Sequence, residues 1–168
     1  QHLLKKILLK FDRKYKIIII ENSLDKNIKK FLENKFKNVE VIIPKKNLGL
    51  ARSYNLGINK SKTKYVFLNN ADIEISDISI KKLLKCAKNL KNFGAISPRF
   101  KDEKIYKNYE IFTPKKNINS KFIKKNKICE VDILDNNFLI EKKSVQKSLF
   151  DENYFLYYET FDFTFNLK

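Results

Sequence analysis

The sequence has few cysteines and no long apolar run, which excludes several classes of protein. Its 168 residues include only two cysteines, Cys86 and Cys129, which are too few and too isolated for a disulfide framework or a zinc site. We predict that both are buried or partly buried thiols in a reducing compartment. No apolar run approaches the length of a membrane span, and residues 1–10 alternate Leu with Lys instead of forming the apolar core of a signal peptide. We therefore expect a cytoplasmic protein, and the hydrophobic fraction of 43% excludes general disorder.

Arginine is scarce, although the chain is strongly basic. The formal net charge is +17, yet the only arginines are Arg13, Arg52 and Arg99. Proteins that read nucleic acids use arginine for bidentate contacts to phosphate and guanine. The lysines are spread along the chain among many Ile and Asn residues, so we interpret them as a solvated basic surface and expect no specific nucleic acid partner. A dedicated polyanion site, or contact with the anionic inner face of a membrane, is the alternative.

Apolar patterns predict helices that alternate with strands in the first hundred residues. Helical spacing covers 3–11, 25–36, 48–59 and 76–90, and short apolar runs predict strands at 15–20, 39–43, 64–69 and 94–97. The run "YKIIII" (15–20) is typical of a strand buried on both faces. This alternation predicts an α/β domain with a mostly parallel open sheet flanked by helices. Ligands of such sheets bind at the carboxyl ends of the strands.

The second half differs from the first in composition, and no clear domain boundary separates the two. Residues 101–127 are polar and rich in Lys, with a predicted strand at 105–112. Further strands are predicted at 128–134 and 137–141, followed by a short helix at 144–149. The last segment is dense in aromatics and acids. We predict one domain, in which the second half is built onto the edge of the first.

Four motifs occur along the chain in a fixed order. They are "IIIIENSLD" (17–25), "KNLGLARSYNLGI" (46–58), "YVFLNNAD" (65–72) and "FDENYFLYYETFDF" (150–163). Together they resemble the motifs of family 2 glycosyltransferases, and the last resembles the rhamnosyltransferase-like branch. The resemblance implies the Rossmann-like GT-A fold, with a nucleotide-sugar-binding half (1–99) and a smaller acceptor and catalytic half (100–168).

The same resemblance implies a reaction and its partners. The donor would be a nucleotide sugar, the acceptor a saccharide or a lipid-linked molecule, and the cofactor Mg²⁺ or Mn²⁺. Transfer would be inverting and would belong to cell-surface polysaccharide biosynthesis. The family normally begins with a strand ahead of the first helix, whereas this sequence starts within that helix. A reduced domain and a fragment are the two interpretations.

The first motif offers contacts to the nucleoside. The resemblance implies that Glu21, which stands where the family usually has Asp, contacts the nucleoside, and Ser23 also matches. The alternative is local structure, because Asn, Ser and Asp25 suit a turn and a helix cap.

The second motif offers contacts to the diphosphate. Asn47, Gly49 and Asn55 match the family element, and Arg52 can supply a cation. Two of the three glycines, Gly49 and Gly57, lie here, which predicts positive φ or a close approach of the backbone. An ordinary glycine turn and a packed interior glycine are the alternative.

The third motif ends in Asn70-Ala71-Asp72, which is similar to a D-x-D metal motif. Asp72 can ligate a divalent cation together with phosphate oxygens, whereas Asn70 can offer a carbonyl or bond a ribose hydroxyl. Glu74 lies on the same side if the strand continues. A simple polar turn is the alternative.

The fourth motif would carry the catalytic base. An inverting transfer needs a carboxylate to take the proton of the acceptor hydroxyl. The middle acid of the family's "ED-x-D" is Thr160 here, which leaves Glu159 and Asp162 as candidates. Asp151 and Glu152 match "FDE" and can order the loop. The aromatics of this segment are interpreted as mostly core, with some that stack on sugar rings.

Two other functions remain open on the sequence. One is a catalytically inactive module that keeps the fold and binds a nucleotide sugar or a partner. The other is a basic protein that binds polyanions or a membrane surface.

Overall fold

The computed structural model describes residues 2–11, 14–91, 93–99, 108–110, 128–145 and 149–167. The helices are α1 (His2–Lys10), α2 (Lys26–Lys35), α3 (Gly49–Lys60), α4 (Asp77–Asn89), α5 (Lys142–Val145) and α6 (Glu159–Phe165). The strands are β1 (Ile17–Ile20), β2 (Val39–Ile42), β3 (Tyr65–Leu68), β4 (Ala95–Ile96), β5 (Tyr109–Glu110), β6 (Ile133–Leu134) and β7 (Phe138–Glu141).

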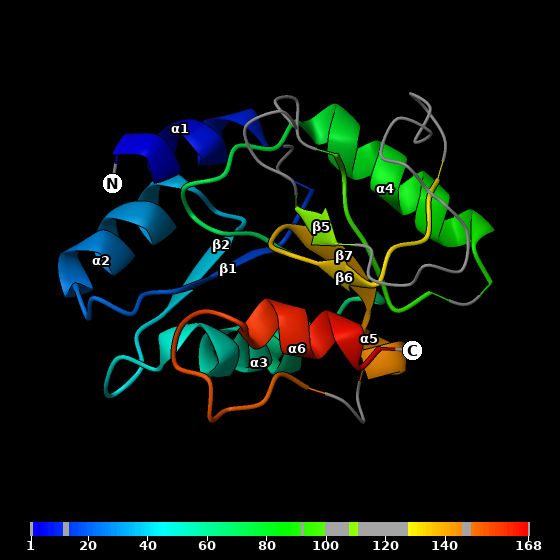
Figure 1. The fold of residues 1–168 in the computed structure, drawn as a ribbon. Helices are drawn as coiled ribbons and strands as arrows, with labels where there is room; N and C mark the ends of the chain where they lie inside the picture. The colour runs from blue at the N-terminus through cyan, green and yellow to red at the C-terminus, as the bar shows by residue number, and fades with distance from the viewer. Residues whose placement is uncertain are drawn as a thin grey trace.

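The first layer pairs β1 and β2 in parallel, with α1 and α2 beside them (Figure 1). Leu8 of α1 and Leu32 of α2 pack with Val39 and Val41 of β2. All four residues of β1 are only partly buried, whereas we expected burial on both faces. The reason is that β1 has one strand neighbour, β2, among the described residues.

The second sheet has the order β3-β7-β4, and β7 is antiparallel to both neighbours. The predicted α/β class is confirmed, but this pairing differs from the expected parallel neighbours. The difference arises because β7, from the second half of the chain, lies between two strands of the first half. β7 also carries the deeply buried run Phe138-Leu139-Ile140.

The side chains of β7 alternate between the two faces of this sheet, as the period of a strand requires. Leu139 packs against α4, whereas Phe138 and Ile140 pack with α3 and α6 on the other face. Figure 1 shows α4 on one side of this sheet and α3 and α6 on the other. On that face Phe163 of α6 stacks on Phe150, with ring centroids 4.0 Å apart. The core therefore joins both halves of the chain.

Several predictions for the second half need correction. The strand expected at 128–134 is confined to β6, and α6 was not predicted. The strand expected at 105–112 is seen as β5, and its other residues lie mainly outside the described ranges. The helix expected at 144–149 overlaps α5 (Lys142–Val145) only at residues 144–145, residue 149 is not helical, and residues 146–148 also lie outside those ranges.

The terminal aromatics are less buried than expected. Phe163 is buried, but Phe155, Tyr157, Tyr158 and Phe165 are exposed because most of them lie in the loop before α6. Cys86 and Cys129 are free and partly buried, as predicted. Of the helices in the described ranges, none combines the length and apolar character needed to cross a membrane.

Candidate active site

Gly49 begins α3 in a conformation that requires glycine. Its φ is +72°, and a Cβ atom there would lie 2.2 Å from the backbone oxygen of Phe155. The next amide, that of Leu50, donates to the same oxygen at 2.9 Å. The prediction of positive φ and close approach is confirmed at Gly49. It is wrong at Gly57, which has open space at its Cβ position.

Asn22 ties the end of β1 to the start of α3. Its Nδ2 donates to Gly49 O at 3.2 Å and to Ser53 Oγ at 2.8 Å, and its Oδ1 accepts from Leu48 N at 3.1 Å. Asn47 Oδ1 accepts from Gly49 N at 2.9 Å in the same turn. We had not singled out Asn22, because its partners lie 26 to 31 residues away.

Glu21 and Ser23 form a local turn. The Glu21 carboxylate accepts from the Ser23 amide at 2.7 Å and also from the Ser23 hydroxyl. Asp25 caps α2 by accepting from Asn27 N at 2.8 Å. The helix-cap alternative is therefore confirmed for Asp25. Glu21 and Ser23 lie just after β1, at its carboxyl end.

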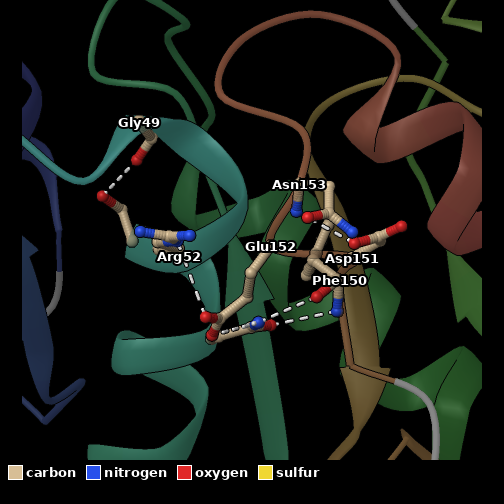
Figure 2. A network of polar contacts seen from close by, with 8 residues as sticks. Gly49, Arg52, Phe150, Asp151, Glu152 and Asn153 are labelled. Atoms are coloured by element: carbon tan, nitrogen blue, oxygen red, sulfur yellow. Dashed lines mark hydrogen bonds and ion pairs between the residues drawn. The ribbon is translucent and has the colours of Figure 1, made fainter.

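Arg52 faces the loop that precedes α6 (Figure 2), and Asn55 bonds to the same loop. Asn55 is buried and bonds both backbone groups of Phe150, with Nδ2 2.9 Å from the carbonyl oxygen and Oδ1 3.0 Å from the amide nitrogen. Arg52 Nε lies 3.6 Å from Glu152 Oε2 in an exposed ion pair. These contacts anchor the loop on α3, which fits the loop-ordering role expected of Glu152.

Asn70 joins three segments at the end of β3. Its Oδ1 accepts from the hydroxyl of Tyr54 on α3, and its Nδ2 donates to Asn136 Oδ1 at 2.8 Å. The neighbouring Asn69 accepts from Asn137 Nδ2 at 2.6 Å. Asn136 and Asn137 have φ of 51° and 50°, a region that Asn tolerates. A row of amides thus holds the end of β3 against the turn before β7.

Asp72 lies in an exposed turn beyond this network. The strand ends at Leu68, and the Ile73 amide donates to Asn70 O at 3.1 Å. The idea that Glu74 continues the strand beside Asp72 is therefore wrong. Glu74 instead pairs with Lys10, which lowers the pKa of its carboxyl group.

Within the described ranges, no group of three or more His, Cys, Asp or Glu side chains is placed to hold a metal ion. Asp72 is a single exposed carboxylate, and the side-chain oxygen of Asn70 accepts from Tyr54. One carboxylate fits a cation that the phosphates of a nucleotide hold jointly, since Mg²⁺ often uses one or two carboxylates plus substrate phosphates.

The acids of α6 have different surroundings. Glu159 is 3% exposed, and its Oε2 is buried without a hydrogen-bond partner among the described residues. Burial, with a smaller contribution from the charge of Asp135, raises the pKa of Glu159. Asp162 instead accepts from Asn166 Nδ2 at 3.1 Å on the helix surface.

Tyr54 lies close to several of these acids. Its pKa is raised by burial and then by the charges of Glu159, Asp135 and Asp72. Tyr54 and Asp135 were not among our predicted site residues. Asp135 could have been found by the rule that applied to Asn70, because it too is a polar residue directly after a strand.

Asp135 is held on two sides. The Thr160 hydroxyl donates to its Oδ1 at 2.9 Å, and its own amide donates to Asn108 O at 2.9 Å. The ends of β3 and β6, the Tyr54 side of α3 and the start of α6 therefore meet at one place. The structure does not bring Asn47 or Asn55 into this bonded network.

Comparison with known proteins agrees with this architecture. No curated protein matches the chain. The crystal structure of GalNAc-T7 with UDP, GalNAc and Mn²⁺ superposes with a TM-score of 0.63 at 15% identity, which shows a shared GT-A fold. That match covers 96% of this chain but only 36% of the other. The model of the family described as Glycosyl transferase family 2 matches residues 1–149, so the chain belongs to glycosyltransferase family 2.

Proposed function

We propose that the protein transfers a sugar from a nucleotide-sugar donor to a saccharide or lipid-linked acceptor, with inversion and with help from Mg²⁺ or Mn²⁺. The main support is the bonded network at the strand ends, in which Tyr54, Asn70 and Asn136 lie beside the pair of Asp135 and Thr160. Polar groups at the carboxyl ends of strands are where open α/β sheets bind ligands.

The donor would lie between the ends of β1 and β3. Glu21 and Ser23 would contact the nucleoside, and Asn70 the ribose or the phosphates. Through the contacts described above, Asn47 and Gly49 would shape the start of α3 around the donor, and Asn55 would hold the loop before α6. Arg52 would offer its charge to the diphosphate. GalNAc-T7, which shares the fold, was crystallised with UDP and Mn²⁺, and this supports a nucleoside diphosphate and a divalent cation here.

The cation would be held by Asp72 together with the diphosphate. When bound, it would neutralise the charge of the departing nucleoside diphosphate. Because the protein offers one carboxylate, we expect weak binding of the metal alone and stronger binding once the nucleotide is present.

The acceptor would approach from the side of α6. Phe155, Leu156, Tyr157 and Tyr158 form an exposed run directly before this helix, with exposed fractions of 48% to 72%. These exposed aromatic rings lie next to Glu159, a candidate base, and can stack on sugars of the acceptor. This run also carries the likeness to the rhamnosyltransferase-like branch, and the basic surface suits the inner face of an anionic membrane.

Binding of nucleoside diphosphates, measured by calorimetry with and without Mn²⁺, tests the donor site. We expect UDP or another nucleoside diphosphate to bind only weakly without Mn²⁺, and Asp72→Ala to remove the effect of the metal. Glu40→Gln, which changes an exposed acid on β2, is the matched control and should bind like the wild type.

Release of nucleoside diphosphate from a panel of UDP-, GDP- and dTDP-sugars tests catalysis. Release that depends on Asp72 supports the transferase. Binding without any release would instead favour an inactive binding module. Steeply salt-dependent binding to nucleic acid, without binding of nucleotides, would favour the polyanion-binding alternative.

A further inference from the structure

The residue that stands in the family's middle acid position is Thr160, which cannot act as a general base. Thr160 is 2% exposed, and its hydroxyl donates to Asp135 Oδ1 at 2.9 Å. A carboxylate therefore does lie at this place, but the turn after β6 supplies it instead of α6. The two residues are 25 positions apart in the sequence, so only the fold brings them together.

The acids of α6 are poorly placed for the same task. Glu159 has its Oε2 atom buried, with no hydrogen-bond partner in the described part of the chain, so that oxygen does not meet a substrate in this arrangement. Asp162 lies two positions after Thr160, and residues so spaced on a helix do not face the same side. It bonds Asn166 along the helix surface instead. Asp135 is partly exposed, so a ligand can reach it.

Asp135 is also joined to the donor side of the site. The next residue, Asn136, accepts from Asn70, which accepts from Tyr54. Raised pKa values of Tyr54 and Glu159 reflect the charge of Asp135 in part, which places the carboxylate close to both. The bond from its amide to Asn108 O fixes the backbone.

We propose that Asp135 is the catalytic base of the transfer and that Thr160 positions its carboxylate. This assignment rests on the proposed function. Asp135 takes the proton of the acceptor hydroxyl while the hydroxyl oxygen bonds to the anomeric carbon of the donor. The bond between that carbon and the diphosphate breaks, and its electron pair leaves with the nucleoside diphosphate.

The first test is Asp135→Asn, which keeps the shape of the side chain and an oxygen that can accept from Thr160. The rate of nucleoside diphosphate release from the responding sugar donor should fall by about 10²- to 10⁴-fold, the usual contribution of a general base. Affinity for the nucleoside diphosphate with Mn²⁺ should stay within about twofold, because a base acts on the acceptor. Glu130→Gln, an exposed acid before β6, is the control and should keep its rate.

A rescue variant separates a base from a structural residue. Thr160→Asp in the Asp135→Asn background returns a carboxylate to the other end of the same hydrogen bond. We expect this double variant to recover at least tenfold of the lost rate. Circular dichroism confirms that each variant is folded.

Different results would overturn different claims. If the wild type is active and Asp135→Asn keeps its rate while Glu159→Gln loses it, the base assignment is wrong and the transferase stands. If a folded wild type releases no nucleoside diphosphate from any donor, the proposed function falls and this assignment falls with it.

Discussion

Gly49 shows how one residue without a side chain joins two parts of the molecule. Its backbone passes so close to Phe155 O that any Cβ atom would clash, and its φ of +72° is unfavourable for other residues. We expect Gly49→Ala to lower the free energy of unfolding by about 2–4 kcal/mol, from the strained backbone and the forced displacement of the loop. Urea denaturation measures this change.

Gly57 provides the matched control for that substitution. It lies inside the same helix, and no atom of the described residues other than its chain neighbours and the nearby helix backbone lies within 4 Å of its Cβ position. Gly57→Ala should raise the free energy of unfolding by about 0.5–1 kcal/mol, because Ala is the better helix former. Equal losses in the two variants would contradict the special role of Gly49.

Single residues of the site could be predicted where the local sequence carries the constraint. Gly49 stood out because the chain has so few glycines, and Asn70 because it ends a buried strand. Asp135 could have been found by the rule that applied to Asn70, but the bonding partners of Asn22 and Asp135 could not be predicted. Their bonds, to Ser53 and Thr160, are set by packing between segments distant in the sequence.

At the scale of elements, α6 is a helix that the sequence pattern does not predict. Its residues "ETFDFTF" alternate polar and aromatic side chains, a pattern more typical of a strand than of a helix. The helix begins after Tyr158, whose φ of 65° turns the chain into it. Stacking of Phe163 on Phe150 then stabilises it from outside. Long, strongly periodic helices such as α2 and α4 were predicted to within a few residues, because their apolar face is evident in the sequence.

Thr164 fixes α6 to β6. Its Oγ1 accepts from Leu134 N at 3.0 Å and lies 3.0 Å from Leu134 O. Thr164→Val keeps the shape but removes the hydroxyl, which should lower the free energy of unfolding by about 1–3 kcal/mol because polar backbone groups lose their partner.

Thr164→Ser is the control for this substitution, since it retains the hydroxyl. It should lose less stability than Thr164→Val in the same urea denaturation experiment. If the two variants behave alike, the bonds to Leu134 do not stabilise the position of α6.

At the scale of the whole molecule, the buried Glu159 links stability to pH. Because its pKa is raised by burial, the folded chain binds this proton more tightly than the unfolded chain, in which Glu titrates near about 4.3. The contribution to stability is therefore largest below that pH and is lost as the pH rises through the folded-state pKa.

Glu159→Gln cannot titrate at this position and provides the comparison. The free energy of unfolding of the wild type, minus that of Glu159→Gln, should fall as the pH rises from about 4 toward neutral and then become constant. Urea denaturation at a series of pH values measures it. A difference that rises with pH would show that the Glu159 carboxylate is stabilised as an ion.

The position of β7 between β3 and β4 also governs how the molecule can assemble during synthesis. The ribosome makes roughly 5–20 residues each second. Several seconds therefore pass between the emergence of β3 and that of the strand that pairs with it. Throughout this interval the nascent chain carries strand edges that lack their native neighbour, which is a known route to aggregation. We infer that the sheet of β3, β7 and β4 forms only late in synthesis. Chaperones that shield unpaired strands would therefore raise the yield of folded protein.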